Sequence, residues 1–225
     1  MTPQSPIAPV AGRLLFGGAM AAVTLVADLL LQFTPRVERV GSPDYLYLLD
    51  ISRSRLLWGH ALGVVAILLM TVGLRAAASL ISGPAWLRRG YESLAVFSCA
   101  GAAVFHALFA PIGLALQTAP DEAGRAALVA ALRPAHEMLG TPILLLYFFA
   151  ATVFSGIVAA GRTPLPRLAA LGTQMPLWLA LLVLARTSPL AGTVIFPAEL
   201  SIGNTIFFLV LARWARPRPK LHLVN

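Results

Sequence analysis

Residues 56–74 read LLWGHALGVVAILLMTVGL, a run of nineteen residues that Arg55 and Arg75 bracket. A helix rises about 1.5 Å per residue, so this run can cross a hydrocarbon core of about 30 Å. His60 is its one ionisable residue. The run therefore predicts a membrane-spanning helix that carries a polar group at membrane depth.

Five further apolar runs have the same character. Together with the first they predict six spans, at residues 14–33, 56–74, 94–116, 138–160, 168–185 and 190–211. We therefore expect an all-α, polytopic six-helix transmembrane bundle, a single membrane domain over residues 1–225. The first run is long for the core of a cleavable signal peptide and contains Asp28, so we interpret it as a permanent helix.

Composition supports a membrane protein and disfavours other classes. The chain is 58% hydrophobic and only 12% charged, whereas soluble domains carry about 25% charged residues. The formal net charge of +8 would suggest nucleic acid in a soluble protein. Here the basic residues flank apolar runs, so orientation and anionic membrane lipids explain them better. The lone Cys99 excludes an internal disulfide and a cysteine-cluster metal site.

The distribution of basic residues predicts the orientation. Ten lie on the side of the two termini: Arg13, Arg75, Arg88, Arg89, Arg162, Arg167, Arg213, Arg216, Arg218 and Lys220. Seven lie on the other side: Arg36, Arg39, Arg53, Arg55, Arg125, Arg133 and Arg186. Basic residues favour the cytoplasmic side, so we expect both termini in the cytoplasm of a multi-pass cell-membrane protein.

Two loops on the outer side contain helix signals. Ser42, Pro43 and Asp44 precede the apolar stretch 45–49, which predicts a short interfacial segment with its tyrosines at headgroup level. Asp121 and Glu122 precede an alanine- and leucine-rich stretch, which predicts a separate short helix within 119–135.

Four ionisable residues within the spans are the leading site candidates: Asp28, His60, His106 and Glu199. Counted from the span centres at 1.5 Å per residue, they lie in one layer less than ~10 Å thick, in the outer half of the membrane. Ionisable residues at this depth are costly and usually face a bundle interior or a functional site. The alternative is a structural role in helix pairing.

Helical spacing suggests which of the four face protein. Stripes of small and polar residues include Asp28 and His106: Gly17, Ala21, Thr24 and Asp28 in the first span, and Ser98, Ala102 and His106 in the third. Small residues at such spacing allow helices to approach closely. The inward orientation of His60 has weaker support, with only Gly63 on its face.

Six secondary candidates lie nearby. His136 and Glu137 precede the fourth span and fit a helix-capping role, while Asp50 and Arg53 are spaced for a local ion pair. Gln174 and Asn204 suit hydrogen bonds between helices. Prolines at 111, 176 and 197 interrupt spans close to polar residues. They fit either a hydrated cavity or ordinary kinks.

The candidate residues favour proton chemistry over metal chemistry. No two histidines lie three or four apart, as helical metal sites usually require, so we expect no metal and no cofactor. An acid in apolar surroundings can hold a proton near neutral pH. We expect a pocket that opens to the outer face and binds or moves a small molecule or lipid with proton coupling. The alternatives are an acid/base enzyme acting on a lipid-like substrate, and an accessory subunit with an oligomeric or protein partner.

Three short motifs carry a resemblance. They are Val26-Ala-Asp28-Leu, Arg55-Leu-Leu-Trp-Gly-His60 and Pro197-Ala-Glu199-Leu. With the six-span pattern they resemble uncharacterised six-span integral proteins of bacterial inner membranes, over nearly the whole chain. The resemblance implies a helical membrane fold and no activity.

Overall fold

The computed structural model describes residues 8–36 and 44–215, and all of its regular structure is helical. The elements are α1 (Ala8–Gln32), η2 (Leu46–Asp50), α2 (Arg53–Ser79), α3 (Ala85–Ala107), α4 (Phe109–Thr118), α5 (Glu122–Ala159), η3 (Arg167–Gly172), α6 (Gln174–Thr187) and α7 (Pro189–Trp214). The expected all-α class is confirmed for the described residues.

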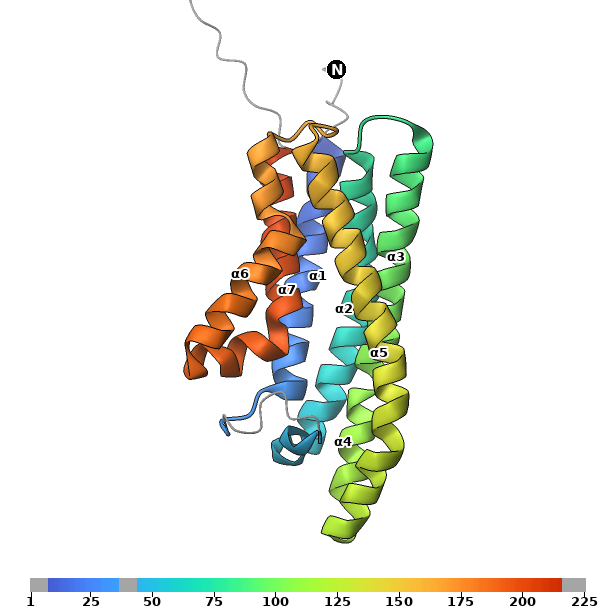
Figure 1. Cartoon of the computed structure of the whole chain (residues 1–225), viewed down its shortest axis with the longest axis vertical. Helices are drawn as coiled ribbons and strands as arrows, with labels where there is room; N and C mark the ends of the chain where they lie inside the picture. The colour runs from blue at the N-terminus through green and yellow to red at the C-terminus, as the bar shows by residue number, and fades with distance from the viewer. Residues whose placement is uncertain (1–7, 37–43, 216–225) are drawn as a thin grey trace, which may run out of the picture.

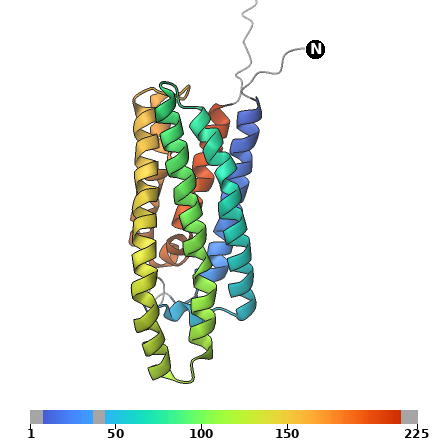
Figure 2. The same ribbon diagram turned by 90° about the vertical axis from the view of Figure 1, so that its right-hand side faces the viewer.

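The helices form an elongated bundle whose members run alternately up and down (Figures 1 and 2). α1 packs extensively on α2 and α7, α2 on α3, and α3 on α5, while α6 packs mainly on α7. α4 continues the direction of α3, so the two form one long rod (Figure 2). The two ends of the described chain, in α1 and α7, lie at the same end of the bundle (Figure 1).

Five stretches of helix are long and apolar enough to cross a membrane: Pro9–Gln32, Arg53–Ser79, Ala85–Thr118, Glu122–Ala159 and Ala191–Trp214. They indicate a multi-pass membrane protein. α6 has 14 residues, about 21 Å at the usual rise, and falls short of a core of about 30 Å. Large apolar side chains cover the outside, among them Trp86, Phe97 and Met138, each more than 70% exposed.

The helix boundaries correct several expectations. The short helix expected within 119–135 and the span expected at 138–160 are one helix, α5, of 38 residues. Glu122 lies in its first turn as expected, and Asp121 caps its start, with its side chain accepting from the Gly124 amide at 2.7 Å. Pro134 lies inside the helix without ending it. The run expected at 168–185 is divided between η3 and α6.

Pro111 has the clearest structural effect among the three prolines. α3 ends at Ala107 and α4 begins at Phe109, so the break lies three to four residues before the proline. A proline ring clashes with the carbonyl four residues upstream and donates no hydrogen bond, which explains the position of the break. Pro176 lies in the first turn of α6, where its missing N–H costs little, and Pro197 lies inside α7.

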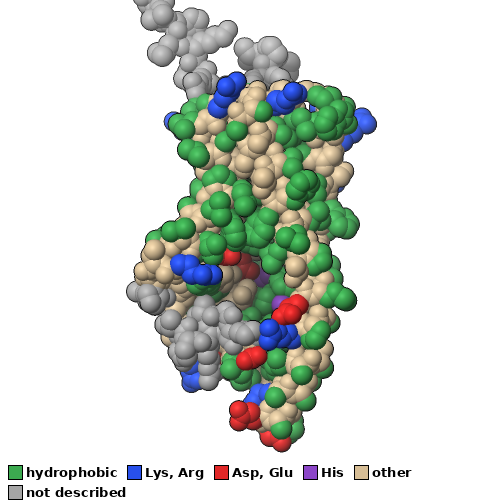
Figure 3. All heavy atoms as spheres, in the orientation of Figure 1, with side chains coloured by type: hydrophobic (Ala, Val, Ile, Leu, Met, Phe, Trp, Pro, Cys, Tyr) green, Lys and Arg blue, Asp and Glu red, His purple; other side chains and the backbone are tan. Residues whose placement is uncertain are grey.

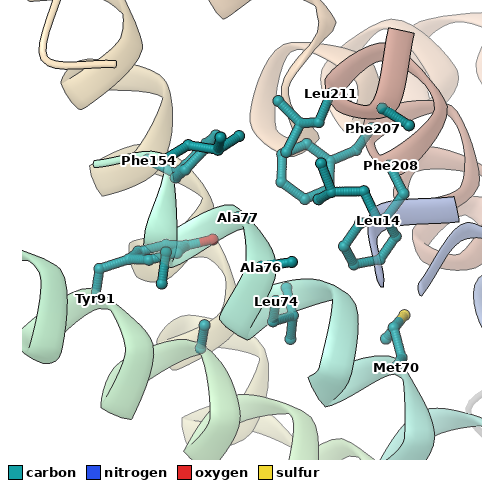
Figure 4. Close-up of a cluster of buried hydrophobic side chains, with 14 of the residues drawn as sticks. Leu14, Met70, Leu74, Ala76, Ala77, Tyr91, Phe154, Phe207, Phe208 and Leu211 are labelled. Atoms are coloured by element: carbon teal, nitrogen blue, oxygen red, sulfur yellow. The ribbon is translucent and has the colours of Figure 1, made fainter. Parts of the chain in front are cut away.

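The larger apolar core lies toward the end of the bundle that holds both described termini. Figure 4 shows Leu14, Leu74, Phe154 and Phe207 converging from four helices. Gly17 and Gly73 let the α1 and α2 backbones touch, because a β-carbon on either would lie 2.7 Å from the other's Cα. The predicted buried stripe on α1 is confirmed, from Gly17 through Asp28.

A second apolar cluster lies toward the opposite end and corrects the expected interfacial segment. Tyr45 and Tyr47 are 6% and 5% exposed, so their side chains are buried against protein and do not lie on the surface of the bundle. With Leu48 they pack against Leu31 of α1 and Leu116 of α4. The expected helix-start residues Ser42 and Pro43 lie outside the described residues.

Candidate functional site

Asp28, His106 and Ser201 meet between three helices. The Asp28 Oδ1 of α1 lies 3.4 Å from the His106 Nδ1 of α3. The Ser201 hydroxyl of α7 donates a hydrogen bond of 2.5 Å to the Asp28 Oδ2. All three residues are at least nine-tenths buried. Two residues of the predicted layer therefore lie in direct contact inside the bundle.

The second nitrogen of His106 reaches a fourth helix. His106 Nε2 lies 3.1 Å from the backbone carbonyl of Gly59 in α2. A carbonyl only accepts, so Nε2 donates and carries a hydrogen. Gly63, one turn further along α2, provides the space, because a β-carbon there would overlap the imidazole ring. The imidazole is thus fixed at both nitrogens.

This geometry sets the number of protons on the pair. When Nε2 carries the hydrogen of a neutral imidazole, Nδ1 is an acceptor, and so is an ionised Asp28 Oδ1. The two atoms can form a hydrogen bond only if one more proton lies between them. That proton lies either on the carboxyl group or on Nδ1. The pair is neutral overall in both forms, which suits a site removed from water.

The serine arrangement differs from that of a hydrolase. In a Ser-His-Asp triad the imidazole accepts the serine proton. Here Ser201 donates to the carboxylate of Asp28 instead. Ser201 therefore helps to satisfy the buried acid and is not activated as a nucleophile.

The Asp28 and His106 side chains line a cavity of about 210 Å³ between the helices. Figure 3 shows a hollow on one face of the molecule, with acidic and histidine atoms visible within it. The polar lining side chains are Thr24, Asp28, Gln32, Ser98, Cys99, His106, Tyr147, Gln174, Glu199, Ser201 and Asn204. The rest of the lining is apolar. Binding pockets commonly combine an apolar wall with a few polar groups in this way.

A polar cluster of three residues links α5, α6 and α7 at the cavity wall. The Gln174 amide donates a short hydrogen bond to Asn204 Oδ1, and the Tyr147 hydroxyl donates to the same oxygen at 3.2 Å. The predicted interhelical hydrogen bonding by Gln174 and Asn204 is confirmed. Tyr147 was not predicted, because a tyrosine in an apolar run gives no signal of its partner.

Glu199 lines the same cavity from α7 and is half-buried. Its Oε1 accepts a hydrogen bond of 3.0 Å from the Trp178 indole of α6. Its Oε2 is buried and has no hydrogen-bond partner among the described residues. Trp178 was not predicted either, since tryptophan in a membrane helix usually indicates an interface.

His60 lies apart from this arrangement. It is half-buried on α2, and it is not among the residues that line the cavity. Its Nδ1 is buried without a hydrogen-bond partner in the described part of the chain. The structure therefore brings three of the four leading candidates to one cavity and leaves the fourth outside.

The secondary candidate His136 is buried among aromatic side chains near the second apolar cluster. Its Nδ1 lies 2.7 Å from the Tyr45 hydroxyl, and the Phe105 ring stacks on it with centroids 4.3 Å apart. Burial raises the pKa of the Tyr45 hydroxyl; Glu137 adds to this effect and Arg133 opposes it. His136 was expected to cap a helix, but it lies inside α5.

The remaining secondary candidates are near the surface. Glu137 is exposed and pairs with Arg133 at 2.7 Å, one turn earlier in α5. Asp50 accepts from the Thr34 hydroxyl at 3.0 Å and lies 3.5 Å from Arg36, both beyond the end of α1. Arg53 is exposed at the start of α2. Within residues 8–36 and 44–215, no three His, Cys, Asp or Glu side chains are grouped as a metal site.

Comparison with known proteins assigns a family and no activity. The sequence pattern of one family of unknown function matches residues 10–215. The chain belongs to DUF6796. The match spans α1 to α7, so the cavity and the polar contacts lie entirely within the family region. No curated protein and no solved structure matches the chain.

Proposed function

We propose that this DUF6796 protein is a multi-pass cell-membrane protein that binds or moves a small molecule or lipid, coupled to the proton held by Asp28 and His106. In this proposal six helical passages cross the membrane and both termini are cytoplasmic. The cavity opens toward the outer half of the bilayer. One observation carries the proposal: the Asp28–His106 pair lies at the wall of a cavity with a largely apolar lining.

Charge at the two ends of the bundle supports this orientation. The end with the termini holds seven described arginines, Arg13, Arg75, Arg88, Arg89, Arg162, Arg167 and Arg213, and one acid, Glu92. The opposite end holds six, Arg36, Arg53, Arg55, Arg125, Arg133 and Arg186, with five acids, Asp44, Asp50, Asp121, Glu122 and Glu137. Basic residues concentrate on the cytoplasmic side of membrane proteins.

The contacts of the pair suggest how proton and ligand could be coupled. Asp28 has a hydroxyl donor on one oxygen and an imidazole on the other, so it can be stabilised with or without its proton. A ligand that contacts His106 from the cavity would compete for that proton or supply another. Binding of the ligand and binding of the proton would then depend on each other, as linkage requires.

Native mass spectrometry of the full chain tests the binding role. We expect a small molecule or lipid to remain bound to the purified wild type and to be depleted in Asp28→Asn, with Glu137→Gln as the control. Flux of the identified molecule into proteoliposomes should then follow the pH gradient and be lost in Asp28→Asn.

Three outcomes would contradict the proposal. Turnover of the bound lipid in detergent, without a gradient, would favour the acid/base enzyme. Co-purification of a protein partner, with no small molecule bound and only stability lost in Asp28→Asn, would favour an accessory subunit. Flux that ignores both the pH gradient and Asp28→Asn would exclude proton coupling.

A further inference from the structure

We propose that the cavity accepts a single-chain amphiphile whose head group donates hydrogen bonds, a long-chain amine or alcohol, and that Glu199 holds this head group. The inference rests on the proposed function, because it names the ligand class of the same cavity. Three observations carry it: an unsatisfied carboxylate oxygen, the balance of charge in the lining, and the apolar wall that continues to the outer surface.

The Oε2 of Glu199 provides the first argument. Trp178 satisfies only Oε1. Oε2 is buried with no hydrogen-bond partner among the described residues. A buried polar atom without a partner is costly, and nearly all such atoms in folded proteins are paired. Glu199 is among the residues that line the cavity, and a hydroxyl or ammonium group that reaches Oε2 from there would supply the missing donor.

The charges of the described lining side chains disfavour an anionic head group when Glu199 is ionised. Among the described residues, the lining holds two carboxylates, Asp28 and Glu199, one imidazole, and neither lysine nor arginine. The Asp28–His106 pair is neutral as a unit, so no other described lining side chain balances the charge of Glu199. Arg186 is not among the described lining residues, but its guanidinium carbon lies 5.8 Å from the centre of the ring of Phe196, which lines the cavity. A fatty-acid carboxylate would therefore face a like charge, whereas an ammonium group would meet an opposite one.

The remaining wall indicates a hydrocarbon chain beside the head group. Ile67, Met70, Leu74 and Ile143 line the cavity. Leu144 also lines it and is 37% exposed on the outer surface of α5. The cavity wall thus reaches the apolar outside of the bundle at Leu144. Figure 3 shows the hollow bordered by hydrophobic side chains and, at its left and lower right, by charged ones. A ligand can enter here directly from the lipid.

The volume limits the size of the ligand. About 210 Å³ is below the range of roughly 300–1,000 Å³ that holds drug-sized molecules. The space fits a head group and the first carbons of one chain. A two-chain phospholipid is too large to enter completely.

Binding of three eight-carbon probes to the full-length protein in phosphatidylcholine nanodiscs tests this inference. Octylamine, octanol and octanoate differ only in the head group, and empty nanodiscs correct for partitioning into lipid. We expect octylamine and octanol to bind and octanoate to bind at least about tenfold more weakly. Glu199→Gln should lower the affinity for octylamine about tenfold or more, which is the effect of losing one charge-assisted hydrogen bond. Glu137 is an exposed acid on α5, and Glu137→Gln should leave the affinity for all three probes unchanged.

A second variant keeps the test valid if Glu199→Gln does not fold. Trp178→Phe removes the indole donor and leaves both carboxylate oxygens available, so octylamine should bind at least as tightly as to the wild type. Octanoate binding as tightly as octylamine, or octylamine affinity unchanged in folded Glu199→Gln, would overturn the inference. So would a loss of octylamine binding in folded Trp178→Phe.

The outcomes separate this inference from the proposed function. A co-purified molecule that is lost in Asp28→Asn, combined with a preference for octanoate, would retain the binding role and overturn the head-group assignment. Failure of all three probes, with no co-purified molecule, would overturn both.

Discussion

His106 can occupy its position only because residue 63 is glycine. Any β-carbon at position 63 of α2 would overlap the His106 Nε2, which lies 3.1 Å from the Gly59 carbonyl. Two glycines of α2 therefore define this side of the site. The carbonyl of Gly59 accepts the hydrogen bond from His106, and Gly63 leaves space for the imidazole ring. The position of His106 in turn places its Nδ1 within 3.4 Å of the Asp28 Oδ1.

Gly63→Ala should displace His106 and destabilise the protein. Overpacking of a buried site costs about 1–3 kcal/mol, and we expect a loss of this size in SDS-unfolding measurements. Gly156→Ala in α5 is the matched control, because a β-carbon there meets nothing within 4 Å. It should be neutral, or stabilising by up to about 1 kcal/mol. Equal changes in unfolding free energy for the two variants would contradict the close contact between Gly63 and His106.

Asp28 and Ser201 should be energetically coupled. Asp28→Ala removes the shared partner of two buried polar groups, so we expect it to be the most destabilising change at the site, by about 3–5 kcal/mol. Ser201→Ala should cost about 1.5–3 kcal/mol, as for a hydrogen bond to a charged group. The double variant should lose less than the sum of the two by about 0.5 kcal/mol or more. Strict additivity in a double-mutant cycle would argue against the contact.

Asn204 should matter more to stability than Tyr147. Asn204→Ala leaves both Gln174 and Tyr147 without their acceptor, at a cost of about 1–3 kcal/mol. Tyr147→Phe loses one bond, worth about 0.6 kcal/mol on average between membrane helices. The two unfolding free energies give the comparison. A larger loss in Tyr147→Phe would reverse the assignment of Asn204 as the central acceptor.

Tyr45 should contribute to a loss of stability in alkali. Burial raises its pKa above the ordinary value of about 10. The folded state therefore holds the phenol proton more tightly than the unfolded chain. This contribution is complete below about pH 10 and is lost as the pH rises through the folded pKa. Tyr45→Phe should make the fall in melting temperature between pH 9 and 11 shallower. If the melting temperature of Tyr45→Phe falls as steeply as that of the wild type, other tyrosines cause the loss of stability.

Impermeant thiol labelling can test the orientation. In a Cys99→Ala background, Ala123→Cys lies at the start of α5 and Gly90→Cys near the start of α3, and both positions are exposed. With cytoplasmic termini, intact cells should label position 123 and not position 90. Labelling of position 90 in intact cells would invert the topology.

Much of the fold followed from apolar run length, because only helices satisfy their own backbone within one segment of a membrane. The helix ends were less predictable. Arg88, Arg89 and Glu92 resembled a boundary, yet they lie within α3. The short helix expected within 119–135 and the span expected at 138–160 were predicted separately, yet both belong to α5. Long helices extend into water beyond their apolar part, and hydropathy does not detect that extension.

The site was predictable where the residue type is costly in lipid. Asp28 and His106 stood out as ionisable residues on stripes of small residues, and they lie in contact. Ser201 and Trp178 gave no such signal, because a serine or an indole in a membrane helix has many ordinary partners. The small residues on each helix face favoured His106 over His60, but the sequence did not show which neighbouring helix each face contacts.

The length of α5 has a practical consequence. Its 38 residues span about 57 Å, nearly twice a hydrocarbon core of about 30 Å. The hairpin of α4 and α5 extends beyond the other helices at the end away from the two ends of the described chain (Figure 2). In the proposed orientation it therefore projects past the lipid. An antibody fragment raised against this projection could add mass for electron microscopy without covering the lipid-facing surface.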